Sequence, residues 1–189
     1  MLGDVERCCA LWYLPQYRID NTFFKITRDE IDISNKGMFC LFPSAHDSNL
    51  APLGKRTVIL VIGAEYNSRG YWEDKKEYFS ECLIKNAEKI IPGLSGKIIF
   101  KEIATPITLY KYTLNMDGAM HGWESTLLQT SSPAISQELP IEGLYLAGHW
   151  VTQRVGQGGI AMVSYSGRNA ARLIIKKFKG KNRAKNNKG

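Results

Sequence analysis

The sequence predicts an α+β fold, in which a helix packs on a mixed sheet. Short apolar stretches at 23–26, 38–42, 57–64 and 98–104 are typical of strands. The stretch at 57–64 (Thr-Val-Ile-Leu-Val-Ile-Gly-Ala) is rich in β-branched residues, which suits a strand buried on both faces. A helical pattern over 75–91 lies between the third and fourth of these stretches, and we expect that helix to cover one face of the sheet.

Two helix boundaries follow from local chemistry. In 75–91, apolar residues recur at spacings of three and four, with Asn86 as a polar interruption, and Pro92-Gly93 is expected to end the helix. Thr105-Pro106 predicts the start of another helix, because the hydroxyl can cap a free amide and proline fits the first turn.

The C-terminal part predicts a strand at 143–147, a loop and a helix at 160–178. Glycines precede that helix in Gly156-Gln157-Gly158-Gly159. They do not form a dinucleotide fingerprint, because eight residues separate Ala147 from Gly156 and no acidic residue follows Glu142. A glycine-preceded helix N-terminus can still bind an anion, and a plain tight turn is the alternative.

The net charge of +7 belongs to the C-terminal end. From Lys176 onward there are six Lys and one Arg and no acid, so the remaining residues hold 18 basic and 18 acidic side chains. We expect 179–189 to be a disordered, solvated tail, and a weak hold on anionic lipid is the alternative. The neutral body has no aromatic and basic stripe, so no nucleic acid partner is expected.

The four cysteines do not predict a metal site or a disulfide. There is no Cys-x-x-Cys pair, and Cys8 and Cys9 are adjacent, so we expect all four to be reduced and mostly buried. No apolar run is long enough to span a bilayer and no signal peptide is evident. These features predict a cytoplasmic protein, with peripheral membrane contact through the basic tail as an option.

Three blocks of sequence resemble one family. Gly143-Leu-Tyr-Leu-Ala-Gly-His-Trp150, followed by Gly156-Gln-Gly-Gly-Ile160 and Ser166-Gly-Arg-Asn-Ala-Ala-Arg172, resembles the closing FAD motif of phytoene desaturases, carotenoid isomerases and retinol saturases. Thr105–Thr113 with Gly118-Ala119 and Gly122-Trp-Glu124, and Phe42–Gly54, are similar to two further segments of that family. The blocks occur in the family order over 42–172, whereas 1–41 match only loosely.

The resemblance implies an FAD-dependent oxidoreductase that acts on an apolar polyene or lipid, and it assigns no catalytic residue. It divides the chain into a substrate-domain portion (1–140), the strand–loop–helix that returns to a Rossmann-type FAD domain (141–178) and the tail. The cofactor-binding residues that it implies are Gly148, His149, Gly156, Gly158, Gly159 and Ile160. Gly148 and His149 would lie near the ribitol and phosphates, although many flavoproteins have Asp in place of His149. Gly158, Gly159 and Ile160 would offer backbone amides to the flavin ring.

The family begins with a Gly-x-Gly-x-x-Gly unit, and this chain has none before Gly156. Three explanations stay open: a truncated gene product, one subunit of a split enzyme with a separate N-terminal FAD-binding half, and a non-catalytic remnant with a binding role. The resemblance also leaves open whether the reaction is desaturation, saturation or isomerisation.

Overall fold

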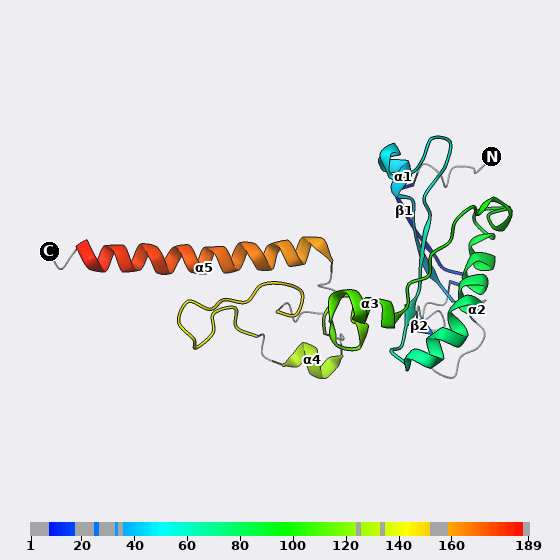
Figure 1. Ribbon diagram of the computed structural model, residues 1–189. Coiled ribbons are helices and arrows are strands. Elements are labelled where there is room, and N and C mark those ends of the chain that lie inside the picture. The colour runs from blue at the N-terminus through cyan, green and yellow to red at the C-terminus, as the bar shows by residue number, and fades with distance from the viewer. Residues whose placement is uncertain are drawn as a thin grey trace. The chain divides into compact units, whose positions relative to one another are not determined.

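The computed structural model describes residues 8–17, 25–26, 33, 36–123, 126–132, 135–151 and 159–186. The chain forms two compact units, which we call unit 1 (Met1–Gly118) and unit 2 (Ala119–Gly189). Strands and helices both occur in the order shown in Figure 1, so the predicted α+β class is confirmed.

The main sheet of unit 1 has three antiparallel strands in the order β1-β3-β4: β1 (Ala10–Tyr13), β3 (Met38–Leu41) and β4 (Ile59–Val61). Burial alternates along β3, where Met38 and Cys40 are fully buried, as the two-residue period of a strand requires. On the opposite face Trp12 stacks on its cross-strand partner Phe39, with ring centroids 4.4 Å apart. A second sheet pairs β2 (Lys25–Ile26) in parallel with β5 (Gly63–Ala64).

Some predicted strands differ in the structure. The predicted strand at 57–64 is divided between the two sheets, and 23–24 lie outside the described residues. The prediction of a strand at 98–104 is wrong: this stretch follows a short 3₁₀ helix, η4 (Ser95–Lys97), without joining a sheet. A strand needs a neighbour for its backbone groups, and none of the described strands pairs with these residues. The stretch at 143–147 contains only an isolated antiparallel bridge between Glu138 and Tyr145, apart from the main sheet.

Helix α2 (Arg69–Ala87) lies beside the main sheet (Figure 1). It starts earlier than predicted, because the Ser68 hydroxyl caps it by accepting from the Tyr71 N–H at 3.2 Å. Its end contributes Ala87, and the following turn Ile91, to a cluster with Met38, Cys40 and Phe42. The polar interruption at Asn86 has a structural role, since its buried Nδ2 donates to the Ile33 carbonyl at 2.7 Å.

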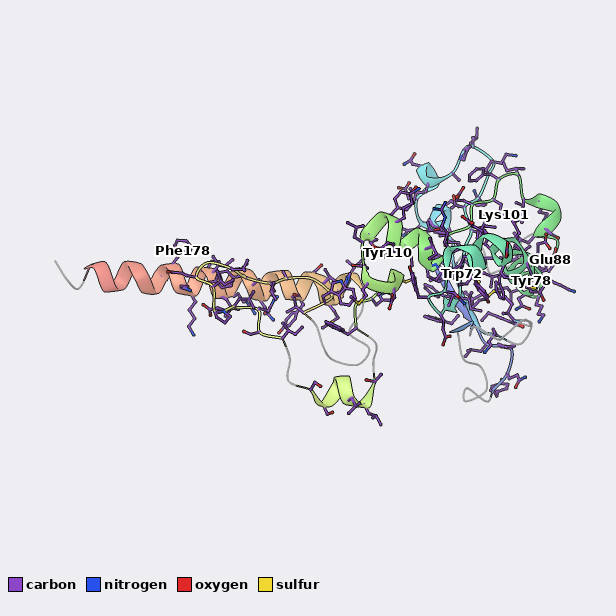
Figure 2. All side chains as sticks on the ribbon, turned by 60° about the horizontal axis from the view of Figure 1, so that its bottom comes forward. Trp72, Tyr78, Glu88, Lys101, Tyr110 and Phe178 are labelled. Atoms are coloured by element: carbon purple, nitrogen blue, oxygen red, sulfur yellow. The ribbon has the colours of Figure 1, made fainter. Side chains whose placement is uncertain are left out.

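The N-terminal half of α2 forms a second cluster in unit 1. Trp72 and Phe79 are buried together with Ile33, and the two rings lie with centroids 5.9 Å apart. Figure 2 labels Trp72 and Tyr78 on this helix and Glu88 directly after its end. The two clusters place α2 against both sheets.

The predicted helix start at Thr105-Pro106 is confirmed by α3 (Pro106–Thr113), whose first turn is held by reciprocal capping between Thr105 and Thr108. The 3₁₀ helix η5 (Met116–Gly118) closes on α3, where a Cβ at Gly118 would lie 2.1 Å from the Pro106 carbonyl oxygen. The shorter helices are α1 (Pro43–His46), η3 (Ser48–Leu50) and α4 (Leu127–Ser131).

Helix α5 (Ile160–Asn186) begins at the predicted residue and continues past 178. The stretch expected to be a disordered tail from 179 is therefore helical as far as Asn186. Lysine, arginine and alanine favour a helix, and cations near a helix C-terminus are stabilised by the helix dipole. Among the described residues no helix is long and apolar enough to cross a membrane.

The described residues contain no cluster of His, Cys, Asp or Glu that could hold a metal ion. None of the four cysteines, all of which lie among the described residues, forms a disulfide. Cys40 is buried and Cys82 is half-buried, but Cys8 and Cys9 are exposed, so the expectation of mostly buried thiols holds only for the first two.

Candidate functional site

The loop that contains Gly148 is fastened to α5 by the buried side chain of Ser166. The Ser166 side chain, in the second turn of α5, accepts a hydrogen bond from the Gly148 N–H at 3.1 Å. Ser166 is only 3% exposed, so this contact is shielded from water. Ser166 is six residues after Ile160, which places the contact about 9 Å along the helix from its first residue.

Gln137 joins the same contact from the other side. Its Nε2 donates to the Ser166 carbonyl at 2.8 Å and to the Leu146 carbonyl at 3.1 Å. The backbone around Gln137 also pairs with this segment, because the Leu146 N–H donates to the Gln137 carbonyl at 2.8 Å. One side chain therefore joins the Gly148 loop, the segment before it and α5. Gln137 was not predictable from the sequence, because its partners are nine and 29 residues away.

A second contact of the segment 137–147 with α5 is electrostatic. Lys177 Nζ lies 3.2 Å from Glu138 Oε1, and it also lies over the Tyr145 ring at 5.9 Å from the centroid. The hydrogen bond to Glu138 raises the pKa of Lys177. Since Ser166 and Lys177 are about three helical turns apart, the segment is held along α5 rather than at one point.

His149 and Trp150 contact the turn at Gly122-Trp123. The Trp123 indole Nε1 donates to the Trp150 carbonyl at 2.7 Å, and the two indole rings meet edge to face with centroids 5.1 Å apart. The His149 ring lies 5.4 Å from the Trp150 ring. Trp123 thus packs on Trp150; Glu124, named beside it in the sequence, lies outside the described residues.

Gly122 is required by this contact for two reasons. Its φ of +86° is a backbone conformation that L side chains rarely adopt. A Cβ at this position would also lie 2.8 Å from the His149 carbonyl oxygen, which is backbone and cannot turn away. The close approach of residues 122 and 149 was not evident from the sequence, although Gly122 belongs to one of the blocks that resemble the family.

The backbone at Gly148 and Gly159 is open. Both have positive φ, +121° and +90°, and a Cβ at either position would meet no heavy atom of the described structure within 4 Å. Gly159 immediately precedes α5 and its carbonyl accepts from the Val163 N–H at 3.2 Å. The next residue, Ile160, is 88% exposed. No described residue therefore crowds the start of this helix, and the first turn of a helix offers backbone N–H groups without intrahelical acceptors.

Four of the six predicted cofactor residues are described. Gly148 and His149 lie in a loop that α5 holds through Ser166, and Gly159 and Ile160 form the start of the same helix. The arrangement thus associates these residues with one end of α5, a suitable location for an anionic group. Gly156 and Gly158 lie outside the described residues, so the assignment of all six stays a prediction.

Comparison with known proteins finds one group of relatives. The chain is 30% identical over 148 residues to the chloroplastic prolycopene isomerase of Daucus carota, covering 72% of this chain and 23% of that protein. It is 33% identical over 141 residues to the chloroplastic prolycopene isomerase of Arabidopsis thaliana, covering 69% and 22%. For chloroplastic prolycopene isomerase 1 of an Oncidium hybrid cultivar the values are 28% over 158 residues, 78% and 26%. No family model matches the chain.

The chain spans about a quarter of the length of the curated relatives that it matches. Because all the matched relatives named above are prolycopene isomerases, the chain is a distant relative of the phytoene desaturase and carotenoid isomerase family.

Proposed function

We propose that this chain is part of an FAD-dependent oxidoreductase that desaturates, saturates or isomerises an apolar, carotenoid- or retinoid-like polyene. The similarity to prolycopene isomerases over about 70–78% of the chain is the observation that carries the proposal. The structure of unit 2 supports it, because the loop that contains Gly148 is bonded to Ser166 near the N-terminal end of α5, where Gly159 and Ile160 also lie.

The residues at this end of α5 suit a flavin nucleotide in two respects. The open backbone at Gly148 and Gly159 leaves room for a group to approach the main chain. The N-terminus of α5 favours negative charge, such as that of a phosphate or of a reduced flavin ring. In this proposal Gly158, Gly159 and Ile160 donate backbone N–H groups to the flavin, and Gly148 and His149 line its ribitol and phosphates.

When bound, the flavin supplies the electron-transfer chemistry and the protein supplies position and electrostatics. The contacts of Ser166 with Gly148 and of Trp123 with Trp150 hold the backbone on the two sides of His149. No side chain of the described residues is assigned a proton-transfer role. The substrate would reach the protein from a membrane surface, with the basic end of the chain as a peripheral contact of a cytoplasmic protein.

The rival proposal is a non-catalytic remnant, or one subunit that works only with a separate N-terminal FAD-binding half. The observation in favour of this rival is that the chain covers only about a quarter of the length of the prolycopene isomerases. The two are distinguished by flavin binding. We would purify the chain alone and together with the N-terminal portion of a prolycopene isomerase, add FAD, remove the excess and record the flavin absorbance bands. A colourless mixture that retains no FAD would contradict the enzyme proposal.

Substitutions at Gly159 test the cofactor site directly. If the flavin lies against the start of α5, Gly159→Val should abolish FAD retention by the mixture while the circular dichroism of the purified chain is little changed. Gly159→Asn is the matched control, because Asn tolerates positive φ better than a β-branched residue. Should Asn leave FAD affinity unchanged while Val lowers only the thermal midpoint, Gly159 is a turn residue and the site assignment is wrong.

A further inference from the structure

Unit 1 contains a cleft that the proposed function does not use. It has a volume of about 560 Å³ and lies between residues 54–58 and the turn at 90–99. Six apolar residues line it, with Ile99 at its edge: Phe42, Val58, Ile90, Ile91, Leu94 and Ile99. The volume falls within the range of about 300–1,000 Å³ found for small-molecule sites.

Three cations line the same cleft. Lys55 and Arg56 come from the loop before β4, and Lys97 comes from η4, 41 residues later than Arg56. No acidic side chain lines the cleft. Among the described residues none of the three forms an ion pair, although Arg56 donates to the Lys55 carbonyl at 3.2 Å. Positive charge is therefore collected at an apolar cleft and left uncompensated there.

The cleft has fixed walls. The Thr57 N–H donates to the Ser44 hydroxyl oxygen at 2.9 Å, and the Thr57 hydroxyl donates to the Leu50 carbonyl at 2.6 Å. On the other side the Lys97 N–H donates to the Leu94 carbonyl at 2.9 Å. The floor belongs to the main core, since Phe42 and Ile91 are buried members of its cluster. Ile99 remains 73% exposed and forms an apolar edge of the cleft.

We propose that this cleft binds a long-chain fatty acid, with its carboxylate among Lys55, Arg56 and Lys97 and its alkyl chain in the apolar interior. A pure hydrocarbon would leave the three cations without an anion to neutralise them. An inorganic anion would leave the apolar interior exposed to water. An amphiphile with one anionic group and one alkyl chain satisfies both halves of the site. The flavin residues proposed above lie in unit 2, so the two proposals fail independently.

The test is isothermal titration of the full chain with monomeric oleate and with oleyl alcohol, which has the same alkyl chain and no charge. We expect a saturable site for oleate that weakens as salt is added, and weaker binding of the alcohol. The double variant Arg56→Ala, Lys97→Ala should weaken oleate binding roughly tenfold or more, since hydrogen bonds to charged groups are the stronger ones. It should leave the alcohol unaffected.

The matched control is Lys75→Ala, Lys85→Ala, which removes two cations from α2 outside the cleft and should leave oleate binding unchanged. Ile99→Glu adds an anion at the exposed edge without disturbing the core and should weaken oleate more than the alcohol. Circular dichroism of each variant verifies folding. Three results would overturn the proposal: equal affinity for oleate and the alcohol, equal loss in the cleft and control variants, or binding to anionic phospholipid vesicles without binding of monomeric oleate.

Discussion

Unit 1 and unit 2 differ in the interactions that stabilise each of them internally. Unit 1 has two buried apolar clusters around α2, which include fully buried Met38, Cys40 and Ile33. In the described part of unit 2 only Ser166 and Ala170 are buried, while α5 exposes Ile160, Tyr165, Ile175 and Phe178. Phe178 is labelled on this helix in Figure 2.

Because burial of apolar surface is the main stabilising term in folding, unit 1 has its own source of stability. Unit 2 depends on a few polar contacts, chiefly those of Ser166, Gln137 and Lys177. The candidate cofactor residues are therefore carried by the less stabilised unit. We expect FAD to stabilise unit 2 rather than unit 1, because a ligand stabilises the part of the protein that binds it.

The largest expected effect is in the core of unit 1. Met38→Ala removes a fully buried side chain at the centre of the main sheet and should lower the free energy of unfolding by about 2–5 kcal/mol. Urea denaturation followed by circular dichroism measures this loss. Met116→Ala is the control, because Met116 is 72% exposed and should change stability by less than about 0.5 kcal/mol. Equal effects would mean that unit 1 lacks the core described above.

The next effect is confined to unit 2. Gly122→Ala adds a methyl group 2.8 Å from the His149 carbonyl oxygen and should separate the 122–123 turn from the 149–150 segment. Gly143→Ala has similar positive φ, +81°, with no heavy atom within 4 Å, so it reports the backbone strain alone, about 1–3 kcal/mol. Hydrogen exchange at residues 146–151 should accelerate much more in the first variant. Identical exchange in both would rule out the close approach.

A smaller effect is expected at the Ser166 contact. Ser166→Ala removes the acceptor of the Gly148 N–H and should cost about 1 kcal/mol, with faster exchange of that amide. Ser164→Ala, on the exposed side of the same helix, keeps the contact and controls for the change in helix propensity. If the Gly148 amide exchanges equally fast in both variants, α5 does not hold the loop.

The smallest effect concerns the exposed pair Lys177–Glu138. Its hydrogen bond raises the pKa of Lys177 in the folded state, so its contribution is complete below the unfolded pKa, about 10.4, and is lost as the pH rises through the folded value. Lys177→Met should remove the part of the protection of residues 138–146 that is lost above about pH 10.4, measured as exchange rates relative to the base-catalysed rates of the unfolded chain. Lys176→Met, one residue away and exposed, should not. If both variants still lose this protection above about pH 10.4, the Lys177–Glu138 pair does not stabilise this segment.

Features that depend on neighbouring residues were predictable from the sequence. The Thr105-Pro106 cap and the start of α5 at Ile160 follow from local capping and glycine chemistry, and both are confirmed. Strands were harder, because pairing is decided by distant partners: 98–104 has strand composition but no neighbouring strand, whereas Ala10–Tyr13 was missed and forms an edge of the main sheet.

The candidate site shows the same contrast between features set by neighbouring residues and features set by distant contacts. Gly159 was identifiable from the glycines that precede the helix, and Gly148 from the family resemblance; both have the positive φ that glycine favours. The contacts that organise the site join residues 122 with 149, 137 with 166, and 148 with 166, and no local signal indicates such pairs. The polar interruption at Asn86 was also unexplained until its bond to the Ile33 carbonyl was seen.

The position of Cys40 at the centre of the main sheet gives unit 1 a chemical reporter of its own opening. Burial raises the pKa of the Cys40 thiol to about 11, so near neutral pH it is protonated as well as inaccessible, and the thiolate is the reactive form. Cys8 and Cys9 are exposed. A thiol reagent should therefore react at once with the N-terminal pair, later with the half-buried Cys82, and in a final slow phase with Cys40. The rate of the slow phase measures how often β3 becomes uncovered, without any substitution in the chain.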